Sequence, residues 1–222
     1  MQGFIKVSNR IFDYNLSSKA IYIYVYLSSK VNCLQYTNAT YEDISCACNM
    51  DTKTAKTGID ELINKGLVTK QNRFNSRGYL ANRYYIKNLI TNNLQWFKVD
   101  RAVFKTNIKA TDFVVFCFIS KCMCSKKQEA FPSLSAISLG TGISRGRVSQ
   151  AVQYLRHFTF INRIRRRYKH TLAFRHNRYM HFKCNVKKGK KRAYTWTVQA
   201  KYPNYSYILP YVVLKINTFM LN

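Results

Sequence analysis

The stretch Phe4-Ile5-Lys6-Val7 is matched ninety-two positions later by Trp96-Phe97-Lys98-Val99, and the likeness continues along the chain. Ile21–Leu27 (IYIYVYL) falls on Phe113–Ile119 (FVVFCFI), and serine and then lysine follow each run. After one inserted residue, the apolar matches are Ile44 with Ile137, Ala55 with Val148, Ile59 with Val152 and Leu62 with Leu155. A fixed internal period of this kind indicates that one structural unit occurs twice.

The repeat predicts the organisation of the 222-residue chain. We expect one domain over residues 1–87, a linker over 88–95, a second domain over 96–182 and a C-terminal extension over 183–222. Apolar residues make up 47% of the chain, which suffices for packed cores and excludes global disorder. No apolar stretch reaches the roughly 18–20 residues of a membrane span, and the first ten residues lack the core of a signal peptide. We expect a cytoplasmic protein with no membrane partner.

Positive charge is concentrated in the second part of the chain, and the formal net charge is +28. Residues 1–93 hold 12 basic and 6 acidic side chains, whereas residues 94–222 hold 25 and 3. No acidic residue follows Glu129. Solubility alone does not account for this pattern, because unrelieved like charge repels itself. It predicts a polyanionic partner, with nucleic acid ranked ahead of an anionic membrane surface.

Local patterns predict three helices in each copy. The run Ile21–Leu27 by itself fits a helix or a strand, and the potential caps Ser17 and Ser18 before it favour a helix. A short second helix and a third helix are expected to follow. Their expected N-caps are Thr40 and Asp51 in the first copy and Ser133 and Ser144 in the second.

The third helix of each copy has an apolar stripe and a polar face. At 100° per residue the stripe consists of Ala55, Ile59 and Leu62, and in the second copy of Val148, Ala151, Val152 and Leu155. The side chains that face away are Lys53, Thr57 and Asp60, and in the second copy Gly146, Ser149, Gln150 and Gln153. The flanking side chains include Thr54 and Lys56, and in the second copy Arg145 and Arg147.

Alternating segments after each third helix predict a β-hairpin. In the first copy the expected strands are Leu67–Gln71 and Tyr79–Ile86, with Arg73, Asn75, Arg77 and Gly78 at the tip. In the second copy they are Phe160–Tyr168 and about Phe174–Phe182, joined by Lys169 and His170.

Three helices followed by a hairpin resemble the winged helix-turn-helix plan. The residues that carry the resemblance are Phe131-Pro132-Ser133-Leu134, Thr141-Gly142-Ile143-Ser144-Arg145-Gly146-Arg147-Val148 and Gly58–Val68 (GIDELINKGLV). They look like the helix-turn-helix domains of bacterial replication proteins and mobile-element regulators. The tandem arrangement over residues 1–182 is similar to replication initiators of plasmids and integrative elements. This implies an α+β, mainly α fold of two tandem winged helix-turn-helix domains, each with three helices and a β-hairpin, ahead of a basic, aromatic extension.

The resemblance also implies sequence-specific binding of double-stranded DNA and association with the nucleoid. In the major groove, glutamine can form two hydrogen bonds to adenine and arginine can form two to guanine. Gln150 and Gln153 are therefore candidate residues for base recognition. Gly146 would let the helix backbone approach DNA, although a structural glycine is the alternative. Asp60 would repel phosphates, so the first copy is expected to read more weakly or to read a different base pattern. The candidate DNA-binding residues are Lys53, Thr54, Lys56, Thr57, Arg73, Arg77, Arg145, Gly146, Arg147, Ser149, Gln150, Gln153, Arg163, Arg165, Arg166, Arg167, Lys169 and Arg175.

Basic residues continue beyond the second reading helix. The run Arg163 to Arg167 is expected to contact phosphates, with a solvated strand edge as the alternative. Lys187–Arg192 (KKGKKR) is expected to be a loop along the DNA backbone, or a nuclear-import signal if the host is eukaryotic. Tyr207–Ile216 is expected to pack on the second domain or on a second copy of the chain.

No metal or cofactor is expected. The seven cysteines form no C-x-x-C pair and are expected to be reduced thiols, with Cys117 in the core. His176, His181 and Cys184 could face a metal, but the sequence offers no second ligand cluster.

Two other classes of function fit the sequence less well. The chain has neither the His-x-His pair of rolling-circle nicking enzymes nor a Walker loop, so no enzymatic activity is expected. An RNA-binding protein would be expected to display aromatic side chains on an open sheet instead of a polar third helix. Two unequal reading helices favour a replication initiator that binds repeated or bipartite origin sites, with a transcriptional regulator as the alternative. Host replication proteins are further candidate partners.

Overall fold

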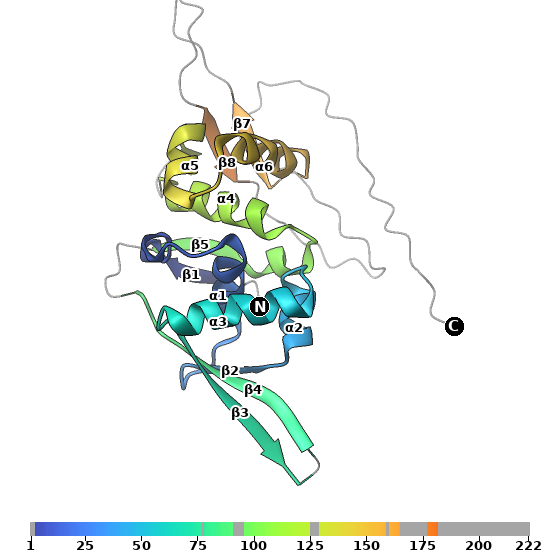
Figure 1. Ribbon diagram of the computed structural model, residues 1–222. Coiled ribbons are helices and arrows are strands. Elements are labelled where there is room, and N and C mark those ends of the chain that lie inside the picture. The colour runs from blue at the N-terminus through green and yellow to red at the C-terminus, as the bar shows by residue number, and fades with distance from the viewer. Residues whose placement is uncertain are drawn as a thin grey trace, which may run out of the picture. The chain divides into compact units, whose positions relative to one another are not determined.

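The structure of the protein is a computed structural model that describes residues 3–76, 78–90, 96–124, 129–158, 160–164 and 177–181 (Figure 1). Residues Met1–Cys184 group into one compact unit, which contains all of these segments. The fold is α+β, and no described helix is both long and apolar enough to cross a membrane. The domain limits drawn from the repeat stay a prediction.

The first half contains the expected helices α1 (Ser18–Lys30), α2 (Tyr41–Ala47) and α3 (Thr52–Asn64). Ser17 caps α1, and its backbone N–H and hydroxyl donate to the two carboxylate oxygens of Glu61 on α3, at 2.6 and 2.5 Å. Thr40 caps α2 through a capping box, and Asp51 caps α3 by accepting from the backbone N–H of Thr54 at 2.7 Å. The predicted caps of the first half are therefore confirmed.

The second half repeats these elements as α4 (Ala110–Lys121), α5 (Leu134–Thr141) and α6 (Arg145–His157). Ser133 caps α5 by accepting from the backbone N–H of Ala136 at 2.9 Å. Ser144 occupies the N-cap position of α6 without a side-chain cap bond. The segments Ile21–Leu27 and Phe113–Ile119 both lie in helices, as predicted.

Each helix-turn-helix turn depends on one residue in the left-handed backbone region. Asn49, between α2 and α3, has φ 49°, and Gly142, between α5 and α6, has φ 68°. The two residues occupy equivalent positions in the repeat. Glycine and asparagine are the residues that adopt this conformation at least cost, so the sequence of each turn suits its geometry.

Each half also carries a three-stranded antiparallel sheet with the same strand order. The first sheet has the order β2 (Tyr36–Ala39), β4 (Gly78–Ile86), β3 (Val68–Asn75). The second has the order β6 (Glu129–Ala130), β8 (Arg178–His181), β7 (Ile161–Ile164). The strands β2 and β6 were not predicted.

The first hairpin differs from the prediction at its tip. Strand β3 continues to Asn75, which pairs with Gly78, so the turn is shorter than expected. Arg73, expected at the tip, lies within β3 opposite Leu80. In the second hairpin β7 and β8 lie within the predicted strand ranges, and residues 165–176 fall outside the described part of the chain.

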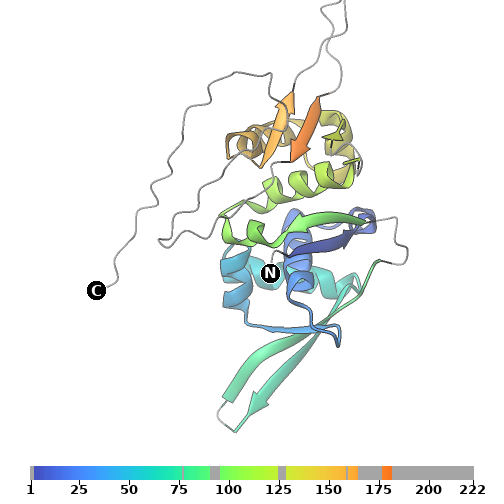
Figure 2. The same cartoon turned by 180° about the vertical axis from the view of Figure 1, so that it is seen from behind.

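The halves are joined by an antiparallel strand pair that follows a local two-fold symmetry. Strand β1 (Phe4–Ser8) pairs with β5 (Trp96–Asp100), each ahead of a 3-10 helix, Asn9–Tyr14 or Arg101–Lys105 (Figures 1 and 2). Lys6 pairs with Lys98, its own counterpart in the repeat. The ammonium of Lys6 lies 4.6 Å from the Trp96 ring centroid, and that of Lys98 lies 4.6 Å from the Phe4 ring centroid. The same cation–π contact is thus made twice, each time between the lysine of one half and an aromatic ring of the other half.

The centre of the hydrophobic core lies between helices α1 and α4, where the two halves meet. The ring of Tyr22 on α1 stacks on that of Phe113 on α4 with centroids 4.1 Å apart, and both residues are fully buried. Two edge contacts repeat the two-fold symmetry, because Phe12 meets Phe118 at 5.3 Å and the counterpart pair Phe104 and Tyr26 meets at 5.4 Å. Aromatic packing therefore holds the halves together as one core.

Candidate nucleic-acid interface

The apolar stripes of the two third helices are buried as predicted. Ala55, Ile59 and Leu62 on α3 have no exposed surface, and neither do Val148, Ala151, Val152 and Leu155 on α6. Burial of a stripe fixes the rotation of a helix about its axis. The polar faces of α3 and α6 must therefore point away from the core.

Most of the polar face of α6 is open to solvent. Arg145, Gly146, Gln150 and Gln153 are exposed, whereas Arg147 and Ser149 are half-buried. Nη1 of Arg147 donates a hydrogen bond to Oε1 of Gln150 at 2.9 Å. Because α6 contains no acidic residue, this face presents donors, amides and positive charge only.

Gly146 has no structural need to be glycine. A methyl group at this position would meet nothing within 4 Å, and the residue does not adopt a positive φ. Gly140 contrasts with it, since a Cβ there would collide with the ring of Phe118, and a Cβ at Gly58 would lie 2.6 Å from Cδ1 of Ile23. The structural alternative for Gly146 therefore finds no support within the protein.

The polar face of α3 is less available than that of α6. Thr54 donates its backbone N–H and its hydroxyl to Asp51, and the hydroxyl of Thr57 donates to the Lys53 carbonyl at 3.1 Å. Lys53 and Lys56 remain as exposed cations, and Asp60 is exposed on the same helix. This composition favours contact with phosphates over reading of bases.

The predicted wing residues are described only in part. Arg73 in β3 and Arg163 in β7 are both half-buried. The predicted contacts Arg77, Arg165, Arg166, Arg167, Lys169 and Arg175 lie outside the described residues. The same holds for the segments Lys187–Arg192 and Tyr207–Ile216.

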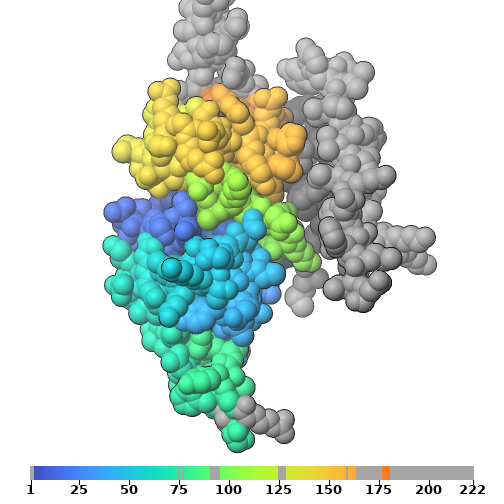
Figure 3. Space-filling view, turned by 45° about the vertical axis from the view of Figure 1, so that its right-hand side comes forward, coloured from blue at the N-terminus to red at the C-terminus, as the bar shows by residue number. Residues whose placement is uncertain are grey.

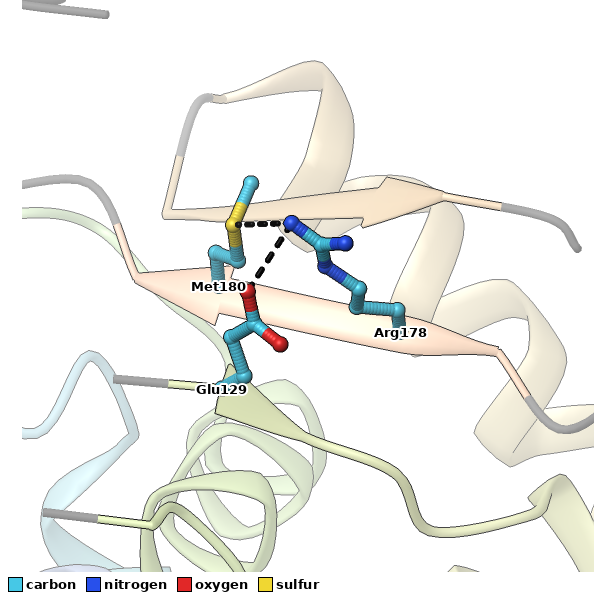
Figure 4. Close-up of polar contacts among 3 residues, drawn as sticks. All are labelled: Glu129, Arg178 and Met180. Atoms are coloured by element: carbon cyan, nitrogen blue, oxygen red, sulfur yellow. Dashed lines mark hydrogen bonds and ion pairs between the residues drawn. The ribbon is translucent and has the colours of Figure 1, made fainter. Parts of the chain in front are cut away.

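Of the three acidic residues of the second half, Asp100 and Glu129 are engaged by other groups, and Asp112 is buried near Arg147 of α6. Asp100 accepts from the backbone N–H of Ala102 at 2.8 Å, and Asp112 is buried on α4. Oε1 of Glu129 lies 2.9 Å from Nη2 of Arg178, which also donates to Sδ of Met180 at 3.8 Å (Figure 4). Within its own half, the positive charge of α6 is therefore offset in part by the buried carboxyl of Asp112.

The described cysteines include both buried and exposed side chains. Cys117 is buried in α4, as predicted, and burial raises the pKa of its thiol well above the usual range. The described cysteines are free thiols. Among the described residues no group of three or more His, Cys, Asp or Glu could hold a metal ion, and His176 and Cys184 lie outside them.

Comparison with known proteins finds similar solved structures but no match at the level of sequence. No family model and no curated protein matches the sequence. Among solved structures, the chain is similar to one described as the crystal structure of Pi initiator protein in complex with iteron DNA. The TM-score is 0.47 at 12% sequence identity, over 80% of this chain and 96% of that one. The identity is too low to transfer the role of any residue.

Sequence reasoning missed a group of exposed aromatic side chains on the first sheet. Phe74 is 68% exposed and Tyr79 is 89% exposed, and Tyr85 is exposed as well. Part of the signal was present in the alternation of β4, where Arg83 and Tyr85 fall on one face while Tyr84 is buried on the other; Tyr79 lies beyond a register shift of the hairpin that the sequence did not indicate.

Proposed function

We propose that the protein binds double-stranded DNA in a sequence-specific manner, with α6 as its main reading helix. The observation that carries this proposal is the exposed polar face of α6. On this face a glycine without structural need lies beside the hydrogen-bonded pair Arg147 and Gln150. A helix fits the major groove, where such side chains discriminate between base pairs.

The distribution of charge supports different contributions of the two halves to DNA binding. Residues 94–222 hold 25 of the 37 basic side chains but 3 of the 9 acidic ones, so the second half supplies most of the attraction to phosphates. The first half contributes Lys53 and Lys56 from α3, where Asp60 opposes close approach to the backbone. The first half would therefore add contacts of lower specificity to those of α6.

The finer proposal is that the protein is a non-enzymatic replication initiator of a plasmid or mobile element, acting in the cytoplasm. Two unequal third helices on one chain suit a bipartite or repeated site, which is the kind of site an origin offers. Host replication proteins would then assemble on the bound chain. A winged-helix transcriptional regulator is the alternative function for the same surface.

Selection of bound sequences from a random duplex pool tests the binding proposal. We expect the full chain to enrich a bipartite or repeated motif, and the Arg147→Ala variant to lose preference at the positions nearest α6. Failure of the full chain to enrich any motif would remove sequence-specific binding.

A replication assay separates the two biological roles. A plasmid whose sole origin contains the selected sites should replicate when the protein is supplied and be lost when it is absent. A changed transcript level from a promoter carrying the sites, without replication, would identify a regulator instead.

A further inference from the structure

The hairpin formed by β3 and β4 continues beyond the third strand of its sheet. Strand β2 pairs with β4 over residues 82–85. Farther out, residues 73–75 of β3 pair with residues 78–80 of β4, and no other described strand joins them. We call these six residues the terminal ribbon. The hairpin carries the terminal ribbon away from the helices (Figures 1 and 3).

A register shift separates the terminal ribbon from the rest of the sheet. Gln71 pairs with Arg83, but the next pair is Arg73 with Leu80, so β4 contains one residue more than β3 in this interval. Such a bulge changes which side chains of the longer strand face each side of the sheet, and it increases the local twist. The two faces of the terminal ribbon must therefore be followed from β3, in which alternation is unbroken.

One face of the terminal ribbon carries two aromatic rings. Alternation along β3 puts Phe74 on the same side of the sheet as Lys70, whose Nζ donates to the Tyr41 hydroxyl on α2 at 3.0 Å. Tyr79 pairs with Phe74 and therefore shares its face. The rings meet edge to face, with centroids 5.8 Å apart and an interplanar angle of 80°. Phe74 and Tyr79 thus project together from the side of the sheet that carries α2.

The terminal ribbon is apolar where water surrounds it. Phe74 is 68% exposed and Tyr79 is 89% exposed, and on the opposite face Leu80 is 38% exposed. Large apolar side chains gathered at a projecting hairpin end are a liability in water unless a ligand covers them. The terminal ribbon is therefore suited to insertion into another molecule.

The charge around the terminal ribbon indicates that this molecule is a polyanion. Residues 65–87 contain six lysine or arginine residues and no acidic residue. Arg73 lies within the terminal ribbon itself, opposite Leu80. A second copy of the chain, with its net charge of +28, is repelled by such a segment. The extension 183–222 has no acidic residue either and is equally unsuited.

The shape of the terminal ribbon suits a groove of duplex DNA. Two-stranded ribbons enter the major or the minor groove. In the major groove a protein reads base pairs largely through polar side chains, whereas the terminal ribbon presents rings. In the minor groove apolar side chains are inserted between base pairs, where they unstack one step and kink the duplex. The composition of the terminal ribbon therefore favours the minor groove.

The angle between the two rings argues against a platform for unpaired bases. Successive bases of a single strand stack on the faces of aromatic rings. At an interplanar angle of 80° the edge of one ring occupies the face of the other, so the pair presents no common plane. A wedge needs no such plane, because one side chain enters the base step while its neighbour supports it.

We propose that the terminal ribbon enters the minor groove of duplex DNA, where Phe74 is inserted between two base pairs and Tyr79 supports it at the edge of the groove. Phe74 is the wedge because phenylalanine has no polar group that would lose its hydrogen bonds inside the stack. The inference rests on the proposed function, since it assumes binding of a duplex. The first half would then recognise deformable steps, such as TA and CA, instead of base edges.

Fluorescence of 2-aminopurine in a duplex tests this proposal with the full chain, because this base brightens when it is unstacked. The probes carry it at a TA step, either beside the selected site or in mixed sequence. We expect the wild type to brighten it and to bend the duplex by about 20–90°, as measured by energy transfer between dyes at the two ends. Phe74→Ala should abolish the rise in fluorescence, reduce the bend and weaken duplex binding by about fivefold or more.

Matched variants separate a wedge from other roles. Phe74→Leu should retain unstacking, because leucine also serves as a wedge. Leu80→Ala is the control, since Leu80 is exposed in the same ribbon but on the opposite face. It should leave unstacking and affinity unchanged. Loss of unstacking in Leu80→Ala but not in Phe74→Ala would put the opposite face in the DNA and overturn the inference.

Replacement of guanine by inosine next to the TA step identifies the groove. Inosine lacks only the N2 amino group, which lies in the minor groove, so the major-groove pattern of the base pair is kept. We expect the replacement to strengthen binding of the wild type but not of Phe74→Ala. No effect on the wild type, or an equal effect on both proteins, would overturn insertion into the minor groove.

The remaining outcomes separate this inference from the proposed function. Enrichment of a motif by the full chain, without a rise in fluorescence at the TA step, would overturn the inference and leave the proposed function standing. Unstacking of the TA step without any enriched motif would have the opposite meaning. If Phe74→Ala lost affinity for a thymidine single strand and kept its affinity for the duplex, the rings would bind unpaired bases and the inference would fail.

Discussion

Arg147 and Gln150 are joined by a hydrogen bond of 2.9 Å on the exposed face of α6, from Nη1 of the arginine to Oε1 of the glutamine. The bond restricts both side chains before DNA arrives, and it leaves the other guanidinium donors of Arg147 and the amide N–H groups of Gln150 free. Holding long side chains in place lowers the entropy cost of binding. The two residues are therefore expected to read DNA as one unit.

We expect Arg147→Ala and Gln150→Ala each to weaken binding of the selected site by about 1–3 kcal/mol. Because each substitution also frees the partner side chain, the double variant should lose less than the sum of the single losses. A double-mutant cycle measured by titration against the selected duplex provides the test. Strict additivity would mean that the two side chains act independently.

Gly146→Ala should lower the affinity for DNA without lowering the stability of the fold. Alanine is favoured over glycine in a helix by roughly 0.5–1 kcal/mol, and a Cβ here meets nothing, so thermal stability should not fall. Affinity for the duplex should fall if the backbone of α6 approaches DNA at this residue. Gly140→Ala serves as the comparison, because its Cβ would collide with Phe118 and lower the stability. Unchanged affinity of Gly146→Ala would place this turn of α6 away from DNA.

The arginine run Arg163 to Arg167, which follows α6, should contact phosphates and should not discriminate between base sequences. We expect Arg165→Ala/Arg166→Ala to weaken binding to all duplexes alike. The slope of log K against log salt should flatten by about 0.9 for each lost phosphate contact. Gln150→Ala should leave that slope unchanged, since an amide neutralises no phosphate. A changed sequence preference in the arginine variant would instead put the second hairpin in the groove.

Asp112 should make stability depend on pH. Burial raises the pKa of this carboxyl above its ordinary value of 3.8, and the nearby cations Arg147 and Lys109 offset part of the rise. Between 3.8 and the raised pKa the folded state binds more protons than the unfolded state, so stability falls as pH increases through this interval. Asp112→Asn removes the charge, and the variant should melt at a higher temperature than the wild type at neutral pH. The difference should shrink on acidification, as followed by circular dichroism. A less stable variant at neutral pH would show that the carboxylate is favourable where it lies.

Phe113 should couple the unfolding of the two halves. Its ring stacks on Tyr22 across the shared core, so Phe113→Ala should lower the free energy of unfolding by about 3–5 kcal/mol. Hydrogen exchange in urea should show α3 and α6 losing protection together. Leu139→Ala, at an 89% exposed position, should change stability by less than about 0.5 kcal/mol. Loss of protection in α3 alone would mean that the halves unfold independently.

Helices and their caps could be predicted because their signals are local. Thr40, Asp51 and Ser133 each accept the backbone bond expected of an N-cap. The polar face of α6 follows from the same 3.6-residue period that buries Val148 and Leu155. Most of the third-helix candidate residues are exposed for this reason.

Contacts between distant segments could not be predicted in the same way. The pairing of β1 with β5 joins segments ninety-two positions apart, and neither strand contains a signal for its partner. The position of Arg73 depends on where the hairpin turns. Because Asn75 pairs with Gly78, the turn comes after Asn75, and Arg73 lies within β3. The sequence placed Thr57 among the candidate DNA-binding residues, but its hydroxyl donates a hydrogen bond to the backbone carbonyl of Lys53 in the same helix.

The pairing of β1 with β5 also governs the order of events during synthesis. Phe4–Ser8 leaves the ribosome first but has no partner until Trp96–Asp100 has followed. In that interval the nascent first half presents an open strand edge and the unstacked ring of Tyr22, a state prone to association with other chains. Once the second half is made, the partner is tethered at high effective concentration. The joint between the halves therefore does not weaken on dilution, as the same two-fold contact between separate chains would.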